Sequence, residues 1–308
     1  MQVFSTLENI KIEKPIVTVG AFDGVHLGHR QVIRRLIECA KSRGGSSVVM
    51  TFWPHPSVVL NPERQFHMLS TLEEKKSLLA ETGIDYLAIL PFTREFSQIE
   101  YADFVSGYLV RDLNMDTLLI GYDNKMGKDG LGHFAELEKL SQKHNFNIQQ
   151  LSALSDDTKP ISSTSIRQLL SEGKVEEAAI SLGRNYSLAG EVVKGNHIGT
   201  TLGFPTANIK PEACKFVPGN GAYAITANVL GSTYLGMLNI GMRPTIEGTS
   251  GDITIEANLF GFNGDIYGQT ASVSFLGKIR DERQFGSVDE LREQLQADRR
   301  YIADKYRL

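Results

Sequence analysis

The sequence predicts an α/β domain with a parallel sheet, followed by an antiparallel β domain that ends in a helix. In the first half, short apolar strand-like runs alternate with helical segments. After about residue 183, strand-like runs follow one another without intervening helices. The last segment, Val288–Tyr306, places apolar residues on one helical stripe that includes Val288, with Ser287 as its expected N-cap. The 308 residues suffice for two domains, which we place at 1–183 and 184–308.

The first half has the pattern of βαβ units, which predicts a Rossmann-like parallel sheet with right-handed crossovers. The expected helices are 30–41, 72–81, 101–111 and 133–143, and a helical pair at 164–172 and 174–182 closes this half. Ligands bind such sheets at the carboxyl ends of the strands. The expected strands are Ile16–Val19, Val48–Phe52, Tyr86–Leu90, Thr117–Gly121 and, more weakly, Asn147–Leu151.

The second half contains successive strands separated by Gly, Asn and Pro turns, which predicts an antiparallel barrel or sandwich. The expected strands are Ser187–Val193, Ala222–Leu230, Tyr234–Ile240, Thr254–Phe260 and Ala271–Ile279.

Composition narrows the class of protein. The net charge is −4 and the pI is near 6.0, so the sequence does not favour a nucleic-acid partner. The sequence has no apolar run long enough to span a membrane. Four of the residues in 8–14 are charged, whereas a signal peptide would be apolar there. Cys39 and Cys214 lack metal-type spacing and fit reduced thiols. We expect a cytoplasmic protein.

The most informative segment is 16–29. A β-rich run stops at Gly20, a turn carries Phe22, Asp23 and Gly24, and His26 and His29 follow where a helix begins. Two imidazoles at i and i+3 share one helix face, beside backbone N–H groups that have no partner inside the helix. This arrangement favours phosphate binding.

Two further loops follow expected strands. In Thr51–Pro56, prolines fix a rigid exit from the strand, and His55 is either a ligand contact or a polar residue in a stiff turn. In 121–128, Asp123 could accept hydrogen bonds from a ribose or an amine, although an Asp that forms a turn is more common.

Hydroxyl side chains gather in a third loop, at the start of the helix expected at 164–172. Ser162, Ser163 and Thr164 are ordinary capping residues by type. Arg167 lies one turn later, and its guanidinium makes the group suited to the phosphates of a leaving group.

In the second half, 195–209 combines glycines with hard oxygen donors. Gly195, Gly199 and Gly203 would let backbone N–H groups approach a phosphate closely. Thr206 and Asn208 would face the same way on an extended chain, and their oxygens suit Mg²⁺. The alternative is a glycine-rich connection with polar turn residues.

The first-half motifs resemble, in order, the adenylyltransferase domain of the bacterial bifunctional riboflavin kinase/FAD synthetase family. The segment 20–29 carries its His-x-Gly-His signature, and 51–56 and 162–167 supply the other two pieces. The resemblance implies that FMN attacks the α-phosphorus of ATP and that pyrophosphate leaves. It also implies that His26 and His29 serve the α-phosphate, and that 162–167 serve the β- and γ-phosphates.

The second half resembles the riboflavin kinase domain of the same family, most specifically in the Pro-Thr-Ala-Asn of 205–208. Segments 239–245 and 280–285, which include Arg280 as a nucleotide-binding residue, fit the same domain. The resemblance implies Mg²⁺ on Thr206 and Asn208. It also implies that Glu256 is the base that takes the proton of the riboflavin hydroxyl as it attacks the γ-phosphate of ATP. The expected barrel and the substrates riboflavin, FMN and ATP follow from it.

The sequence departs from the family pattern at named positions. Residues 123–127 lack the two aromatic residues expected at 124 and 126, and Asn258 stands where a His is common. Gly261 stands where the family usually has an Asp, and Thr200 stands where it usually has a basic residue. No Gly-x-x-x-x-Gly-Lys-[Ser/Thr] is present, which excludes a P-loop kinase.

The leading hypothesis is therefore an enzyme that makes FMN from riboflavin and then FAD from FMN. The missing aromatic pair motivates a second hypothesis, a riboflavin kinase with a degenerate first domain. A third hypothesis is a non-catalytic flavin-binding protein. The metal donors and Glu256 speak against it, because a carrier needs neither.

Overall fold

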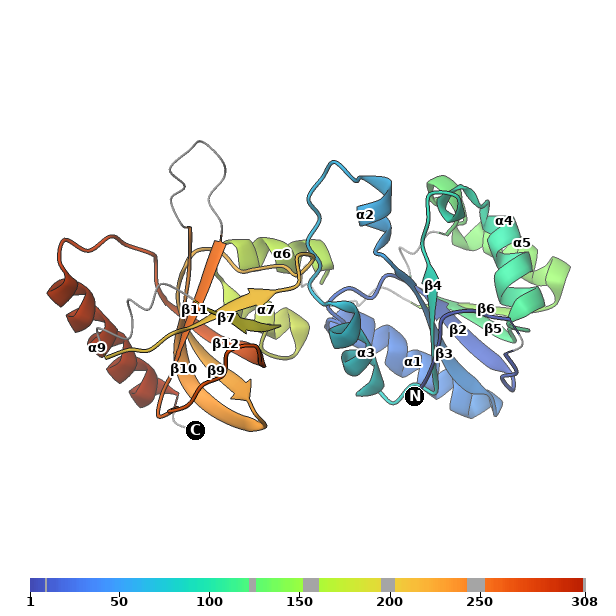
Figure 1. Cartoon of the computed structure of the whole chain (residues 1–308). Helices are drawn as coiled ribbons and strands as arrows, with labels where there is room; N and C mark the ends of the chain where they lie inside the picture. Colours follow the sequence, from blue (N-terminus) through green and yellow to red (C-terminus); the bar gives the residue numbers. More distant parts are fainter. Residues whose placement is uncertain (9, 122–125, 152–160, 195–202, 243–252, 307–308) are drawn as a thin grey trace. The chain divides into compact units, whose positions relative to one another are not determined.

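The computed structural model describes residues 1–8, 10–121, 126–151, 161–194, 203–242 and 253–306. The chain divides into two compact units, unit 1 (1–162) and unit 2 (163–308), and each is described by itself (Figure 1). This division lies before the helices α6 (Ser163–Ser171) and α7 (Val175–Leu182), whereas the change of period in the sequence lies after them.

These two helices belong to unit 2 because they bond to its strands and loops. The amide of Gly219 donates to the carbonyl oxygen of Leu170 at 2.9 Å. The Glu176 carboxylate accepts from the amide of Lys278 at 3.4 Å. A helix signal carries no information about the sheet it will cover, so the sequence pattern could not assign them.

Unit 1 is a six-stranded parallel sheet in the order β1-β4-β3-β2-β5-β6. The five predicted strands are present. The first strand, β1, was not predicted, since it is short and largely exposed. The strands are β1 (Gln2–Phe4), β2 (Pro15–Val19), β3 (Ser46–Trp53), β4 (Tyr86–Pro91), β5 (Thr117–Ile120) and β6 (Asn147–Gln150).

Helices cover both faces of this sheet (Figure 1). On one face, Ile16 and Val49 pack with Leu36 of α1 and Leu79 of α3. On the other face, the alternate strand residues, such as Val17 and Val48, pack with Phe104 and Leu137. Successive side chains of a strand point to opposite faces, so continuous apolar runs are needed to bury both. The helices are α1 (Leu27–Arg43), α2 (Pro56–Leu60), α3 (Leu72–Ala80), α4 (Tyr101–Asp103), which continues into a π-helix (Phe104–Asp112), and α5 (Phe134–His144).

Unit 2 is a closed antiparallel barrel in the order β10-β11-β8-β7-β12-β9, which decides between barrel and sandwich. The sequence pattern missed β8, because its residues follow a glycine-rich segment and only Ile209 among them is fully buried. The strands are β7 (Ser187–Val193), β8 (Ala207–Pro211), β9 (Gly221–Val229), β10 (Ser232–Met242), β11 (Ile253–Leu259) and β12 (Thr270–Arg280).

The final helix, α9 (Val288–Lys305), packs on the barrel through Leu291, Leu295 and Ile302. The Ser287 hydroxyl accepts from the amide of Glu290 at 3.2 Å, which confirms the predicted N-cap. Val288, expected on the apolar stripe, is instead 61% exposed and does not belong to the core cluster that contains Leu291, Leu295 and Ile302.

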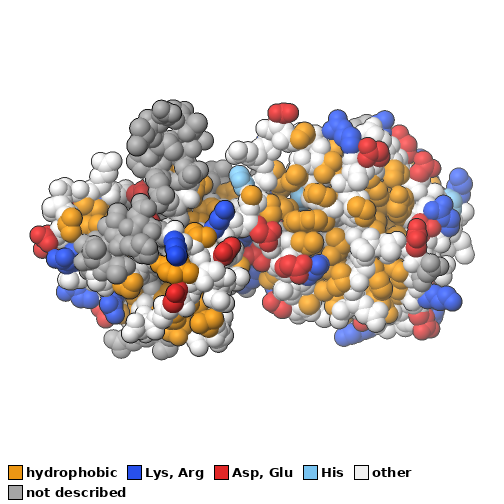
Figure 2. Space-filling model, in the orientation of Figure 1, with side chains coloured by type: hydrophobic (Ala, Val, Ile, Leu, Met, Phe, Trp, Pro, Cys, Tyr) orange, Lys and Arg blue, Asp and Glu red, His pale blue; other side chains and the backbone are white. Residues whose placement is uncertain are grey.

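The visible surface of unit 1, at the right of Figure 2, has hydrophobic side chains across its middle and charges of both signs around its edge. Among the described residues, none of the helices combines the length and the apolar character that a membrane crossing requires.

Candidate active sites

The strand order of unit 1 reverses at β2. The chain runs from β2 to β3 and β4 on one side and then returns to β5 on the other side of β2. In parallel α/β sheets, ligands bind in the crevice outside the carboxyl ends of the strands at such a reversal. The predicted loop 20–26 begins at this crevice.

The loop after β2 has an unusual backbone. Phe22, Gly24 and Val25 all have positive φ angles, of 47°, 78° and 39°. A positive φ is unfavourable for a β-branched residue such as Val25, so surrounding contacts must hold the loop in this form. A Cβ at Gly24 would also meet the side chain of Leu69 at 2.8 Å, which explains the glycine there.

Asp23 holds this loop to the chain that precedes α3. Its buried carboxylate accepts from the amides of Leu69 at 3.0 Å and Ser70 at 3.1 Å. The amide of Gly24 in turn donates to the Ser70 hydroxyl at 3.0 Å. The sequence predicted a nucleotide contact for Asp23. The structure commits its carboxylate to the backbone, so this residue positions the loop.

His26 and His29 lie together at the start of α1. His26 is the N-cap, and its Nδ1 accepts from the amide of His29 at 3.4 Å. The two rings stack with centroids 3.7 Å apart, and Phe22 packs at 5.1 Å against His29. Burial, followed by the charges of His26 and Lys75, holds the pKa of His29 well below its usual range.

The Nδ1 atom of His29 is buried and has no hydrogen-bond partner in the described structure. A buried polar atom without a partner is costly, so its presence needs an explanation. The backbone beside it also passes close to another predicted segment. A Cβ at Gly28 would lie 3.7 Å from the carbonyl oxygen of Ile161, which precedes Ser162. The start of α1 and the chain just before Ser162 therefore lie close together within unit 1.

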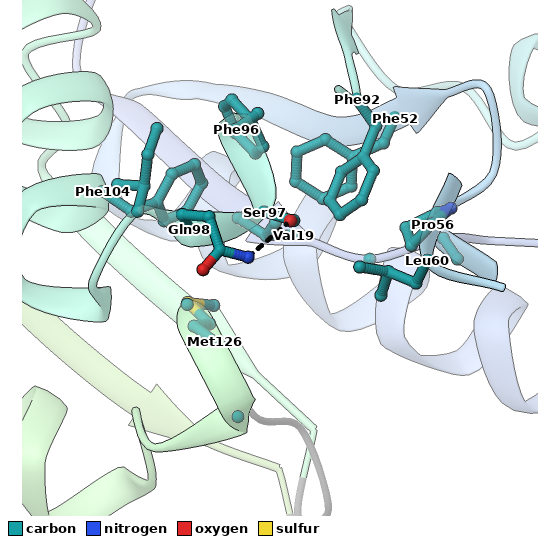
Figure 3. A pocket seen from close by; sticks show the side chains of 15 residues that line it. Val19, Phe52, Pro56, Leu60, Phe92, Phe96, Ser97, Gln98, Phe104 and Met126 are labelled. Atoms are coloured by element: carbon teal, nitrogen blue, oxygen red, sulfur yellow. Dashed lines mark hydrogen bonds between the residues drawn. The ribbon is translucent and has the colours of Figure 1, made fainter. Parts of the chain in front are cut away.

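An apolar cavity of about 490 Å³ opens at the carboxyl ends of β2 and β3 and beneath the chain that follows β4 (Figure 3). Its volume is in the range of small-molecule sites. Gly20 lies in its wall. At its polar edge, the side-chain amide of Gln98 donates to the hydroxyl of Ser97 at 3.2 Å. The wall consists of Val19, Gly20, Ala21, Phe52, Pro56, Leu60, Phe92, Phe96, Ser97, Gln98, Ile99, Phe104, Met126, Gly127 and Gly130.

Aromatic side chains thus line the cavity although 123–127 lack the expected pair. Phe52, Phe92, Phe96 and Phe104 come from β3, from the chain after β4 and from the π-helix, and Figure 3 shows their rings around the cavity. Met126 lies on the opposite wall. Asp123 and Asn124 lie outside the described residues. The sequence signal for three of them is the high density of aromatic residues between 92 and 104.

The remaining predicted residues of the first half occupy separate places. His55 is buried and caps α2, with Nδ1 accepting from the amide of Ser57 at 3.1 Å and its ring stacked on Phe66. The prolines therefore lead into a short helix, which the sequence pattern missed. Ser163, Thr164 and Arg167 lie in the first two turns of α6, in unit 2.

In unit 2, Asn208 of β8 pairs directly with Glu256 of β11, and Glu256 pairs with Asn239 of β10. Directly opposed residues of antiparallel strands project to the same face, so three polar side chains form one row. All three are partly exposed, as is Thr206 just before β8. Gly203 has a φ of 80°, which favours glycine, whereas Gly195 and Gly199 lie outside the described residues.

Two further residues of unit 2 join separate segments of the chain. Asn258, two positions after Glu256, donates its amide to the carbonyl oxygen of Pro205 at 2.8 Å and so fixes the chain before Thr206. The Arg280 guanidinium forms an ion pair of 2.9 Å with the buried Asp298 of α9. Arg280 was predicted to bind nucleotide. In the structure its charge holds the final helix to β12.

Two protein families and several known proteins match this chain. Residues 9–165 match the family described as FAD synthetase, and residues 182–305 match the family described as riboflavin kinase. The chain is 37% identical to the bifunctional riboflavin kinase/FMN adenylyltransferase of Listeria monocytogenes, over 92% of this chain and 90% of the relative. The chain belongs to the bifunctional riboflavin kinase/FMN adenylyltransferase family.

A second relative and a solved structure are also similar to this chain over nearly its whole length. The Bacillus subtilis bifunctional riboflavin kinase/FMN adenylyltransferase is 36% identical over 93% of this chain and 90% of the relative. A solved Streptococcus pneumoniae structure described as a macrolide-efflux protein is 30% identical, covers 98% of both chains and superposes with a TM-score of 0.88. The predicted bifunctional enzyme, which makes FMN and then FAD, is confirmed.

Proposed function

We propose that unit 1 performs adenylyl transfer at the crevice beside β2, with FMN in the apolar cavity and the α-phosphate of ATP at His26 and His29. The buried Nδ1 of His29 carries this proposal, because it has no partner among the described residues and lies at a helix N-terminus, where anions bind. The cavity adjoins the same loop through Gly20 and Ala21. Its apolar, aromatic wall suits a flavin ring system.

In this proposal the FMN phosphate oxygen attacks the α-phosphorus, and the bond to the leaving pyrophosphate breaks. No covalent enzyme intermediate is needed, so the residues position the phosphates and offset charge. His26 accepts the amide of His29 through Nδ1 and therefore, when neutral, carries its proton on Nε2. Burial lowers the pKa of His29 and so favours its neutral form. A neutral imidazole offers one ring N–H to a phosphate oxygen.

The leaving pyrophosphate also needs hydrogen-bond donors. Ser162, Ser163, Thr164 and Arg167 would serve the β- and γ-phosphates of the leaving group. Gly20, Phe22, Asp23 and Gly24 shape the loop, and His55 and Asp123 remain proposed nucleotide contacts.

We assign the kinase site to the row of polar residues in unit 2. Glu256 is the proposed base for the riboflavin hydroxyl, and the oxygens of Thr206 and Asn208 would hold Mg²⁺. Hard oxygen donors from a hydroxyl and an amide fit this cation, which usually takes its other ligands from phosphates and water. The ion would neutralise charge on the ATP phosphates. Glycines 195, 199 and 203 would bring backbone N–H groups to these phosphates.

Removing one donor tests the adenylyl site. FAD formation from supplied FMN and MgATP should fall on the order of 10²–10³-fold in His26→Ala, by analogy with the loss of an oxyanion-hole donor. FMN formation by the same protein is the control and should persist. Unchanged FAD formation would contradict the site.

Removal of the metal tests the proposed ion. EDTA should stop both activities and Mg²⁺ should restore them. Metal-independent turnover would contradict the proposed ion.

A further inference from the structure

Lys75 of α3 is a completely buried lysine that the proposed mechanism has not used. Its side chain has 0% exposure. Its Nζ donates to the carbonyl oxygen of Ala21 at 2.8 Å and lies 5.7 Å from the centre of the Trp53 ring. Burial of a cation is unfavourable, so a lysine is kept in such a place only when its contacts compensate. Burial lowers the pKa of Lys75, and the negative charge of Asp23 opposes that shift.

The acceptor, Ala21, occupies a central position in unit 1. It lies in the wall of the cavity and directly precedes Phe22, whose ring packs against His29. The hydroxyl of Thr51 on β3 donates to the same Ala21 carbonyl oxygen at 3.2 Å. One carbonyl group thus joins α3 and β3 to the loop between the cavity and the histidine pair.

This contact acts on a backbone that needs support. Ala21 is followed by Phe22, Gly24 and Val25, all with positive φ. Asp23 and Ser70 hold the far side of the loop, whereas Lys75 and Thr51 hold its beginning. A loop fixed at both sides cannot relax toward the more favourable negative φ values.

We propose that Lys75, together with Thr51, is a positioning residue for adenylyl transfer, because it holds the Ala21 carbonyl and so fixes the distance between the cavity and the histidine pair. The inference rests on the proposed function of His26 and His29. Lys75 does not touch substrate, since it is enclosed. Its effect is on the alignment of the FMN phosphate with the α-phosphorus, where small displacements strongly reduce the rate.

The test compares Lys75→Met with Lys76→Met in the full chain. Methionine keeps the unbranched side chain but removes the donor. Lys76 is the next residue on the same helix, and its ammonium group pairs with Glu73 at the surface. We expect Lys75→Met to lower kcat for FAD formation about tenfold or more, with KM for ATP changed much less. Lys76→Met should behave as wild type, and FMN formation should be equal in all three proteins.

Thr51→Val removes the second hydrogen-bond donor to the Ala21 carbonyl oxygen. This variant tests the inference even if Lys75→Met does not fold. Valine has the shape of threonine without the hydroxyl, and we expect kcat for FAD formation to fall several-fold. Because both donors act on one oxygen, the losses in the double variant should differ from the product of the single losses. Hydrogen exchange should accelerate at residues 21–26 in each variant.

Three results would overturn the inference: wild-type kcat in both variants, equal losses in FAD and FMN formation, or strictly multiplicative losses. His29→Ala, measured in the same series, separates this failure from failure of the proposed site. If His29→Ala abolishes FAD formation while Lys75→Met and Thr51→Val do not change it, only the role of Lys75 is wrong. If His29→Ala retains FAD formation, the proposed adenylyl site itself is wrong.

Discussion

Asn208 and Glu256 are directly opposed across the neighbouring strands β8 and β11 of the barrel. A proposed metal donor and a proposed base, separated by forty-eight positions in the chain (256 − 208), therefore project from the same face. Glu256→Gln and Asn208→Asp should each stop FMN formation, while FAD formation from supplied FMN continues. Product analysis with riboflavin and then with FMN checks this, and equal loss of both products would refute the two-site assignment.

If FMN binds in the cavity of unit 1, the aromatic residues of its wall should determine the KM for FMN. Phe92 is partly exposed and lines the cavity, so Phe92→Ala removes aromatic contact without opening the core. KM for FMN should rise roughly tenfold, since loss of one stacked aromatic contact costs about 1 kcal/mol or slightly more. KM for riboflavin in the kinase reaction should not change. A normal KM for FMN would place the flavin elsewhere.

The histidine pair makes unit 1 sensitive to acid. The unfolded chain protonates His29 near its ordinary pKa of 6.5, whereas the folded pKa lies well below this value. Between the two pKa values the unfolded state binds more protons, so the free energy of unfolding falls as the pH falls below about 6.5. One proton contributes at most about 1.4 kcal/mol per pH unit. Urea unfolding of wild type and His29→Asn at several pH values measures the contribution. An identical pH slope in the two proteins would exclude it.

The ion pair between Arg280 and Asp298 should hold α9 to the barrel. Arg280→Met leaves Asp298 buried without its partner, and we expect a loss of about 3–5 kcal/mol in the free energy of unfolding of unit 2. Arg292→Met is the matched control, because its pair with Asp289 is exposed and worth less than about 1 kcal/mol. Urea unfolding measures both losses. Similar losses in the two variants would show that burial of Asp298 is not decisive.

The sequence predicted the elements whose signal is local. Continuous apolar runs marked β2 to β5, and the helix-start pattern placed His26 and His29 together at one N-terminus. Ser287 was recognised as a cap from residue type alone. In each case the signal lies within a few residues of the chain, although the strands themselves pair with distant segments.

What the sequence did not predict depends on contacts between distant segments. Lys75 and Lys76 look alike in a charged helix, and only the Ala21 carbonyl determines which of them is buried. The ion pair between Arg280 and Asp298 of α9 was likewise not predicted, because the two residues come from separate elements, and the nucleotide-binding role of Arg280 stays a prediction. The aromatic wall was missed for the same reason, since its phenylalanines come from several elements that converge only in the folded sheet.

We propose that one chain carries two separable sites, one at His26 and His29 and the other at Asn208 and Glu256. The most direct test gives purified His29→Ala riboflavin and MgATP, with wild type beside it, and separates the flavins over time. Wild type should produce FMN and then FAD, whereas His29→Ala should accumulate FMN and form no FAD. If FMN formation falls as much as FAD formation in His29→Ala, the separation of the two sites is wrong.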